Sequence, residues 1–271
     1  MMNRPSRLQH GFTLIELIMV IVILGIVGAM VAVFMRKPID AYFDTARRAA
    51  LSDAADTVVR RMSRDIRKAL PNSLRQANNQ CIEFIPTKTG GRYRADVDAS
   101  GNGDFLDFSK SDNSFDMFGA NSALADQQIV KDDLIAVYNL GIPGADAYAG
   151  DNTSRVTVVQ TGSLAGETKI RINGKKFPFA SPNNRFQVIP GNEAIVSYVC
   201  TGGNLYRNSN YAYASSCPAT GGSLMASGVT CKFIYNGSDL QRNGLVQIEL
   251  AISQGGETVS LYHEINVNNT P

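Results

Sequence analysis

The sequence RPSRLQHGFTLIELIMVIVILGIVGAMVAVFM, residues 4–35, begins with two arginines and continues into a long apolar run. No charged residue lies between Leu17 and Met35, and as a helix this span rises about 28 Å. That length matches the hydrocarbon core of a bilayer. Arg36 and Lys37 end the run, so the sequence predicts one transmembrane segment near the N-terminus.

Glu16 is the unusual residue of this segment, because a carboxylate inside a membrane helix is costly. A secretory signal peptide has a shorter apolar stretch with small residues at its far end, where it is cut. Here the candidate cut lies before the run, so the run stays in the mature chain. An ordinary signal anchor explains the length and the basic flank. It gives no reason for the order Gly11-Phe12-Thr-Leu-Ile-Glu16.

This combination of basic leader, Gly11, Phe12, Glu16 and apolar helix resembles the N-terminus of type IV prepilins and type II secretion pseudopilins. The resemblance implies that a membrane-bound prepilin peptidase cuts between Gly11 and Phe12 and methylates the new Phe12 amine. Residues 1–11 are then a cleaved leader. It also implies that Glu16 meets the Phe12 amine of a neighbouring subunit in a fibre, where opposite charges attract strongly at low dielectric.

Further stretches are similar to the O-type minor pilins encoded with mannose-sensitive haemagglutinin (MSHA) pili, namely KPIDAYFDTARRAALSDAADTVVRRMSRDIRKALPNSLR, CIEFIPT, FLDFSKSDNSFD and GLVQIELAISQGGETVSLYHEINVNNTP. J-type pseudopilins and W-type minor pilins are wider relatives. The resemblance implies a non-enzymatic subunit that primes or caps a type IV pilus. Its implied partners are minor and major pilin subunits, the prepilin peptidase and the inner-membrane pilus assembly platform. Two alternatives stay open, a type II secretion pseudopilin and a tip adhesin.

A pilin-like α+β fold is expected, with one long N-terminal helix packed on an antiparallel β-sheet. Residues 12–37 form the transmembrane half of the helix, and Pro38 predicts a bend or short break. Residues 38–71 form an amphipathic half that ends at Pro71-Asn72. Its apolar stripe recurs every three or four residues: Ile39, Phe43, Ala46, Ala50, Ala54, Val58, Met62, Ile66 and Leu70.

Residues 72–271 predict a single β-rich domain stapled by disulfides, because short β-branched runs alternate with turn residues. Two Gly-Gly turns, at 201–204 and 254–257, predict hairpins. Residues 99–128 are expected to be a surface insertion. The predicted strands are Cys81–Thr87, Gly91–Val97, Leu134–Leu140, Arg155–Gln160, Thr168–Ile172, Arg185–Ile189, Ala194–Thr201, Leu205–Arg207, Val229–Tyr235, Leu245–Ser253 and Thr258–Val267.

Charge gives no reason to expect nucleic acid as a partner. The chain has 26 Lys and Arg against 24 Asp and Glu. Loss of Arg4 and Arg7 with the leader leaves equal numbers. The dense basic stretch between Arg47 and Lys68 alternates with aspartates, which indicates a solvated, ion-paired helix surface.

The positive-inside rule places the leader in the cytoplasm and the domain in the periplasm, across a single pass of the bacterial inner membrane. Four cysteines in that oxidising compartment predict two disulfides. Three pairings are possible. We favour Cys200–Cys217, which closes a local loop, with Cys81–Cys231 as the remainder. A zinc site is disfavoured because the sequence has no CxxC and no histidine beside these cysteines.

A calcium loop is suggested by oxygen-bearing residues at the spacing of a twelve-residue EF-hand loop. They are Asp96, Asp98, Ser100, Asn102, Asp104 and Asp107. Gly103 stands where an apolar residue normally packs, and no amphipathic helix precedes the loop. The competing interpretation is an Asx-rich turn. No other cofactor is expected.

Catalytic motifs are missing from the sequence, which contains no GxSxG, HExxH or phosphate loop. His10 leaves with the leader, and His263 is expected to pack within the last strand. A tip adhesin would have a sugar-binding patch of Tyr206, Tyr211, Tyr213, Asn208 and Asn210. The preferred interpretation is that this loop packs internally or against a partner.

Overall fold

The computed structural model describes residues 11–213, 217–218, 221–237 and 244–271. The chain forms two compact units, Met1–Ala50 and Leu51–Pro271, which we describe separately. Helix α1 (Leu14–Arg67) supplies the described helix of the first unit and the first element of the second. The leader, including Arg4, Arg7 and His10, lies outside the described residues.

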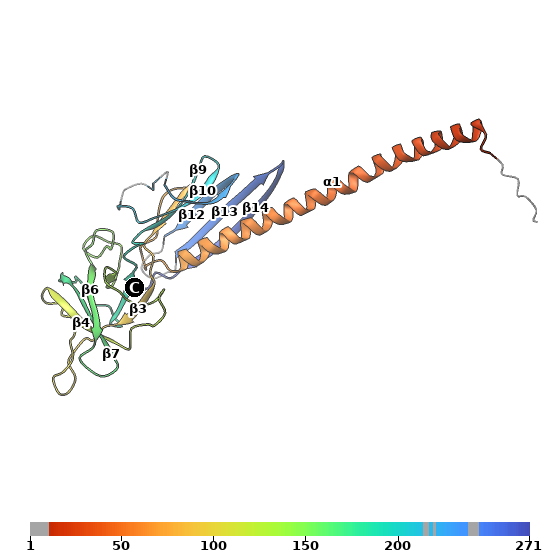
Figure 1. Cartoon of the computed structure of the whole chain (residues 1–271). Helices are drawn as coiled ribbons and strands as arrows, with labels where there is room; N and C mark the ends of the chain where they lie inside the picture. The colour runs from red at the N-terminus through yellow and green to blue at the C-terminus, as the bar shows by residue number, and fades with distance from the viewer. Residues whose placement is uncertain (1–10, 214–216, 219–220, 238–243) are drawn as a thin grey trace, which may run out of the picture. The chain divides into compact units, whose positions relative to one another are not determined.

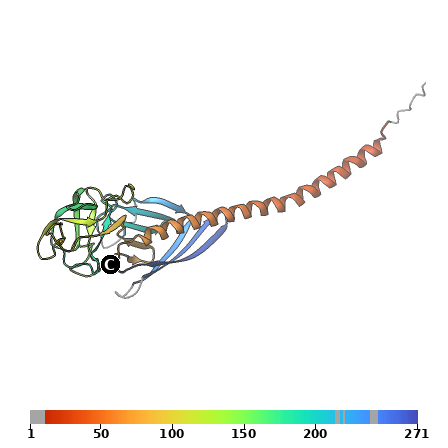
Figure 2. The same cartoon turned by 90° about the horizontal axis from the view of Figure 1, so that it is seen from below.

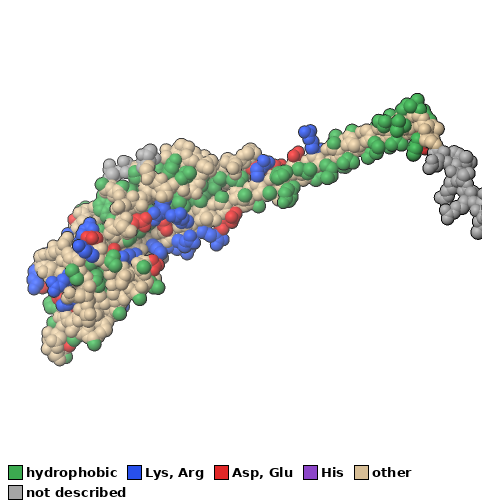
Figure 3. All heavy atoms as spheres, viewed as in Figure 1, with side chains coloured by type: hydrophobic (Ala, Val, Ile, Leu, Met, Phe, Trp, Pro, Cys, Tyr) green, Lys and Arg blue, Asp and Glu red, His purple; other side chains and the backbone are tan. Residues whose placement is uncertain are grey.

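In the first unit, the apolar side chains of α1 are exposed along the whole run from Leu14 to Met35 (Figure 3). By length and composition this helix is able to cross a membrane. The helix also continues through Pro38, so the predicted break is wrong. A proline removes one hydrogen bond from the ladder, and the bonds on either side hold the helix together.

In the second unit, α1 buries one face, formed by Leu51, Ala55, Val58, Val59, Met62, Ser63 and Ile66. The predicted stripe is therefore correct from Val58 to Leu70. Ile39 and Phe43 are instead exposed within the first unit. The helix ends at Arg67, earlier than predicted, because Ala69 leaves it to bridge with Pro86.

Two antiparallel sheets pack on the buried face of the helix (Figures 1 and 2). The five-stranded sheet has the order β1-β2-β9-β10-β11, and the three-stranded sheet has the order β12-β13-β14. Phe84 and Tyr198 from the first sheet and Phe233 from the second join the helix in one core. The bounds are β1 Arg75–Asn78, β2 Cys81–Phe84, β9 Val196–Thr201, β10 Asn204–Ser209, β11 Ser223–Ser227, β12 Val229–Asn236, β13 Gly244–Gln254 and β14 Glu257–Val267.

Both predicted Gly-Gly hairpins are confirmed. Thr201 pairs with Asn204, and Gln254 pairs with Glu257. All four turn glycines have positive φ, as such two-residue turns require. In the last hairpin Val246 faces Ile265, and Leu250 faces Leu261, so one apolar face is directed to the core.

Residues 85–195, between β2 and β9, form a third sheet, of six strands, with the order β3-β8-β5-β6-β7-β4. An isolated bridge between Tyr93 and Met117 brings its two end strands together. We call this segment the inserted barrel. It has its own core, and it lies beyond the C-terminal end of α1 (Figure 1). The bounds are β3 Thr89–Arg92, β4 Asp112–Phe118, β5 Leu134–Ala136, β6 Thr153–Thr161, β7 Glu167–Lys175 and β8 Arg185–Ile189.

The surface insertion predicted at 99–128 is wrong in part. β4 lies inside it, and Leu106, Phe115 and Met117 are buried in the barrel core. Strands β1 and β11 were not predicted, and β3 begins two residues before the predicted strand. The Gly, Ser, Asn and Gln residues of these three strands have little intrinsic β-propensity. Their strand conformation therefore depends on pairing with neighbouring strands.

The inserted barrel joins the rest of the unit through a small core and a network of asparagine side chains. Leu70 and Ile85 pack against Ile189 of β8. Asn72 donates from Nδ2 to the Asn139 carbonyl at 2.9 Å, and Asn139 donates from Nδ2 to the Pro71 carbonyl at 2.7 Å. Buried amides with satisfied hydrogen bonds fix one arrangement of the joint.

Candidate processing and assembly site

The N-terminal site begins with three non-helical residues, Gly11, Phe12 and Thr13. Phe12 is 82% exposed, and nothing lies within 4 Å of a Cβ built at Gly11. α1 begins at Leu14, one residue after Thr13. The predicted cleavage site between Gly11 and Phe12 is therefore an accessible, non-helical segment.

Thr13 caps the helix. The Glu16 backbone N–H donates to Thr13 Oγ1 at 3.3 Å. The order Thr-Leu-Ile-Glu is the S/T-x-x-E capping box, in which the acid stands at the third helical position. A carboxylate in the first turn also interacts favourably with the helix dipole. This local role for Glu16 was readable in the sequence and was missed there.

Between Glu16 and Arg36 the helix contains no charged residue. Its side chains from Leu17 to Met35 are all exposed within the first unit. Apolar exposure on this scale marks a surface that a membrane or a partner covers. The site thus consists of an accessible processing point, a capped acidic turn and an uncovered apolar helix.

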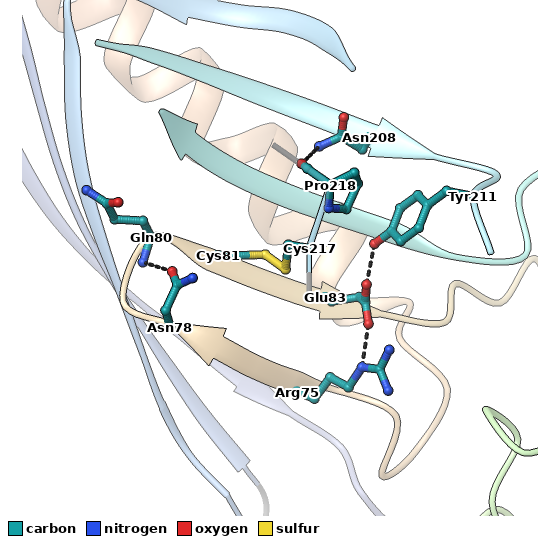
Figure 4. Close-up of a disulfide and its surroundings, with 9 residues drawn as sticks. All are labelled: Arg75, Asn78, Gln80, Cys81, Glu83, Asn208, Tyr211, Cys217 and Pro218. Carbon is teal, nitrogen blue, oxygen red and sulfur yellow. Dashed lines mark hydrogen bonds and ion pairs between the residues drawn. A yellow bond between two sulfur atoms is a disulfide. The ribbon is translucent and has the colours of Figure 1, made fainter. Parts of the chain in front are cut away.

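The predicted disulfide pairing is wrong. Cys81 is bonded to Cys217 (Figure 4), and Cys200 is bonded to Cys231. Their Cα–Cα separations are 6.4 and 6.1 Å, within the range of a disulfide. The pairing follows the sheet order: Cys200 on β9 lies over β12 in the shared core, while Cys81 on β2 meets the loop that follows β10.

Two tyrosines of the predicted patch contact other side chains of the domain, although Tyr213 keeps 42% of its surface exposed. Tyr211 donates its hydroxyl to the buried Glu83 carboxylate, which also accepts from Arg75 (Figure 4). Burial and this hydrogen bond raise the pKa of Tyr211. Tyr213 meets the Tyr148 ring edge-on at 5.2 Å.

The remaining members of that patch lie apart from any common surface. Asn208 is buried, and its side chain donates to the Pro218 carbonyl at 3.3 Å. Tyr206 pairs with Val199 and Leu224 in the five-stranded sheet, and Asn210 occupies a turn with positive φ. The sequence contains no local signal for the Arg75–Glu83–Tyr211 cluster, because its members come from β1, β2 and the loop after β10.

The predicted calcium loop does not gather its oxygens around one point. Asp98 Oδ1 accepts from the backbone N–H groups of Ser100 and Asn102, each at 2.8 Å. Asp104 Oδ2 accepts from Ser114 at 2.7 Å and lies 3.0 Å from Lys169 Nζ. Asp96 accepts from its neighbour Val97.

The Asp107 carboxylate also accepts hydrogen bonds from within its own turn. Hydrogen bonds from the side chain and backbone of Ser109 lower the Asp107 pKa. Across the part of the chain that the structure describes, no group of three or more His, Cys, Asp or Glu is placed to hold a metal ion. The geometry fits the Asx-rich turn better than a calcium loop.

His263 is half-buried in β14 opposite Ile248.

Comparison with known families finds one match. Residues 6–32 match the prokaryotic N-terminal methylation motif. No curated protein and no solved structure matches the chain significantly. The match covers residues 6–11 of the predicted leader, Phe12, Glu16 and most of the apolar run, and the motif is carried by structural fibre subunits. Together with an exposed apolar helix long enough to span a membrane in the first unit and the antiparallel sheets of the second, the motif indicates a type IV pilin- or pseudopilin-like protein.

Proposed function

We propose that the chain is a minor pilin that primes or caps an MSHA-like type IV pilus, as an O-type subunit. The observation that carries this proposal is the N-terminal site: an accessible, non-helical Gly11-Phe12 segment, a capped turn with Glu16, and an uncovered apolar helix. The stretches similar to O-type minor pilins support the choice of system. A structural role also accords with the contacts that Tyr211 makes inside the domain.

The exposed Gly11-Phe12 segment is accessible to a processing enzyme. A prepilin peptidase cuts the chain there, on the cytoplasmic side of the inner membrane, and methylates the Phe12 amine. The helix then holds the subunit in the membrane, with the domain in the periplasm, until the assembly platform moves it into a fibre. Burial of the apolar helix among other pilin subunits replaces its contact with lipid.

We assign two roles to Glu16, and an experiment has to distinguish them. Within one subunit it belongs to the helix cap, and between subunits it pairs with the charged Phe12 amine of a neighbour. Glu16→Gln keeps a side chain that suits a capping box but removes the charge. Glu16→Leu removes both. We expect both variants to be cleaved normally and to be depleted from sheared fibres, because the charge pair sets the stagger between subunits. Normal co-assembly of Glu16→Gln would contradict the charge-pair role and leave only the cap.

The choice of fibre is tested in a deletion strain, by electron microscopy of sheared surface material with secreted enzymes assayed from the same cultures. Loss of fibres with normal secretion supports the pilus assignment. Intact fibres with trapped exoproteins would instead identify a type II secretion pseudopilin. If both fibres and secretion survive and only attachment fails, the chain is a tip adhesin.

A further inference from the structure

Two arginines of the inserted barrel stand directly opposite each other. β3 pairs antiparallel with β8, and in this register Arg92 faces Arg185. Directly opposed residues of an antiparallel pair have Cβ atoms about 5 Å apart, and like charges in that position destabilise the sheet. Both side chains are exposed. The chain therefore retains a repulsive pair at the end of this sheet.

Neither guanidinium has a hydrogen-bond or ion-pair partner among the residues that the structure describes. The side chains of Thr89 and Gln187, which flank them, also lack such partners there. All four residues line one groove of about 430 Å³, together with Thr87, Gly90, Gly91 and Phe186. The lining contains no Asp or Glu. Hydrogen-bond donors and positive charge thus gather in a groove without an acid.

Gly90 keeps this groove open. It faces Gln187 across the strand pair, so the Gln187 side chain has no cross-strand neighbour covering it on that side. A Cβ at Gly90 would lie only 2.8 Å from the Phe186 carbonyl oxygen. The close approach of the two backbones excludes any larger residue, and the space above Gln187 stays accessible.

A different explanation is that the arginines guard the free edge of β3 against pairing with another chain. Edge strands commonly carry charges for this purpose. One charge on β3 is sufficient for that role. It does not account for a second arginine on β8, placed where it repels the first, or for the Gln187 side-chain donor on the same face.

We propose that Arg92 and Arg185 form a binding site for an oxyanion group, a phosphate or a sulfate. Guanidinium groups bind such anions through paired, charge-assisted hydrogen bonds. An anion between the two arginines converts their repulsion into two attractive contacts, and Gln187, on the same face of the strand pair, supplies a further donor. The site lies in the inserted barrel and does not depend on the role of the N-terminal helix in a fibre.

The test measures thermal unfolding of the full chain in detergent by calorimetry, with inorganic phosphate against chloride at equal ionic strength. A ligand that binds the folded state and not the unfolded state raises Tm, and the rise grows with the logarithm of the ligand concentration above Kd. We expect phosphate to raise the Tm of the unmodified chain. Arg92→Gln and Arg185→Gln should remove this rise, while slightly raising the Tm without phosphate because the repulsion is gone. The matched control is Arg171→Gln, an exposed arginine of β7 that faces Ser114 and Val158.

Direct titration calorimetry with phosphate gives a second readout if a glutamine variant folds poorly. Arg92→Lys keeps the charge but loses the paired donors, so binding should weaken by about tenfold. Dextran sulfate distinguishes the source of the group. Binding of both probes indicates a site for a free ion, and binding of dextran sulfate alone indicates a group carried on a polymer.

Three results would overturn the proposal. The first is no Tm rise with either probe. The second is a rise that persists in both glutamine variants. The third is an equal loss of the rise in the Arg171→Gln control, which would indicate nonspecific attraction. Aggregation of the glutamine variants without any anion effect in the unmodified chain would assign the arginines to edge protection instead.

Discussion

Among single residues, Asp65 connects the helix to the five-stranded sheet. The Tyr198 hydroxyl donates to Asp65 Oδ2 at 2.7 Å, and Arg207 Nε donates to the same oxygen at 2.8 Å. Arg207 also pairs with Glu193 at 2.6 Å. Burial, followed by the negative charge of Asp65, raises the pKa of Tyr198. The hydroxyl therefore stays protonated in the folded chain at pH values where an unfolded tyrosine has ionised.

Replacing this tyrosine gives a pH-dependent prediction. Tyr198→Phe should lower the free energy of unfolding by about 1–2 kcal/mol at pH 7, because one hydrogen bond to a carboxylate is lost. Because the pKa of Tyr198 is raised on folding, its protonated hydroxyl contributes fully to the free energy of unfolding below the unfolded pKa near 10, and this contribution is lost as pH rises further. Tyr198→Phe has no such group to lose. The difference in unfolding free energy between the unmodified chain and the variant should therefore narrow between pH 9 and pH 11. Urea unfolding across that range would contradict the prediction if the difference stayed constant.

Two neighbouring glycines of the 96–107 turn allow a matched comparison. Both have positive φ, 81° at Gly101 and 104° at Gly103. A Cβ at Gly103 would lie 2.6 Å from Arg94 Cδ, whereas nothing lies within 4 Å at Gly101. Arg94 is held by an ion pair with the buried Glu167. The apolar position expected of a calcium loop is thus taken by a glycine that makes room for an arginine.

We expect Gly101→Ala to cost about 1 kcal/mol of unfolding free energy, for the backbone conformation alone. Gly103→Ala should cost about 1–3 kcal/mol more, because Arg94 has to move from Glu167. Paired urea titrations of the two variants measure the difference. Equal losses would mean that the Arg94 side chain adjusts freely.

At the scale of elements, the sequence predicted correctly those helices and strands that form through interactions between residues close together in the chain. The apolar run and its charged ends predict α1, and alternation with Gly-Gly turns predicts β9, β10, β13 and β14. β4 was missed because its sequence, Asp112–Phe118, begins with three polar residues inside a stretch rich in turn formers. Its strand character comes from pairing with β7.

The candidate site divides in the same way. Gly11, Phe12 and Glu16 are contiguous, so a motif was sufficient to place them. The disulfides join residues 136 and 31 positions apart, and their pairing depends on the order of strands in the folded sheets. Sequence separation alone favours the short loop and therefore the wrong pair. The cross-strand Arg92–Arg185 pair was invisible for the same reason, since register is a property of the assembled sheet.

Pro38 gives the prediction that belongs to α1. An internal proline removes a backbone hydrogen bond and destabilises a helix by about 3 kcal/mol. Pro38→Ala should therefore slow amide hydrogen exchange around residues 36–42 by about tenfold or more, in the full chain in micelles. Exchange at residues 58–66, where one face of the helix is buried in the second unit, should not change and serves as the control. Unaltered exchange beside residue 38 would mean that neighbouring helix bonds already compensate fully.

At the scale of the whole molecule, the second unit contains two large cores. Met62 belongs to the core between helix and sheets, and Phe115 belongs to the core of the inserted barrel. Both side chains are fully buried. The small cluster around Leu70 and Ile85 and the asparagine network lie between the two cores, and polar contacts such as the Arg207–Glu193 ion pair also connect the two regions. We therefore expect the helix–sheet region and the inserted barrel to unfold in part independently of each other.

We therefore expect core truncations to act locally. Met62→Ala and Phe115→Ala should each cost about 2–5 kcal/mol of local stability. Hydrogen exchange with mass spectrometry should accelerate in peptides of α1, β9 and β13 for the first variant and in peptides of β4 to β8 for the second. Equal acceleration in both regions for both variants would show a single cooperative unit.

The position of the inserted barrel bears on how the chain reaches this structure. β2 and β9 are neighbours, yet the whole barrel lies between Phe84 and Val196, which pair across them. Closing so long a loop is slow and entropically unfavourable in an unfolded chain. Within the barrel, however, β3 pairs with β8 and the Lys88 N–H donates to the Val188 carbonyl at 2.9 Å. A barrel that folds first thus holds its own two ends together, and the long-range closure of the five-stranded sheet becomes a short-range one.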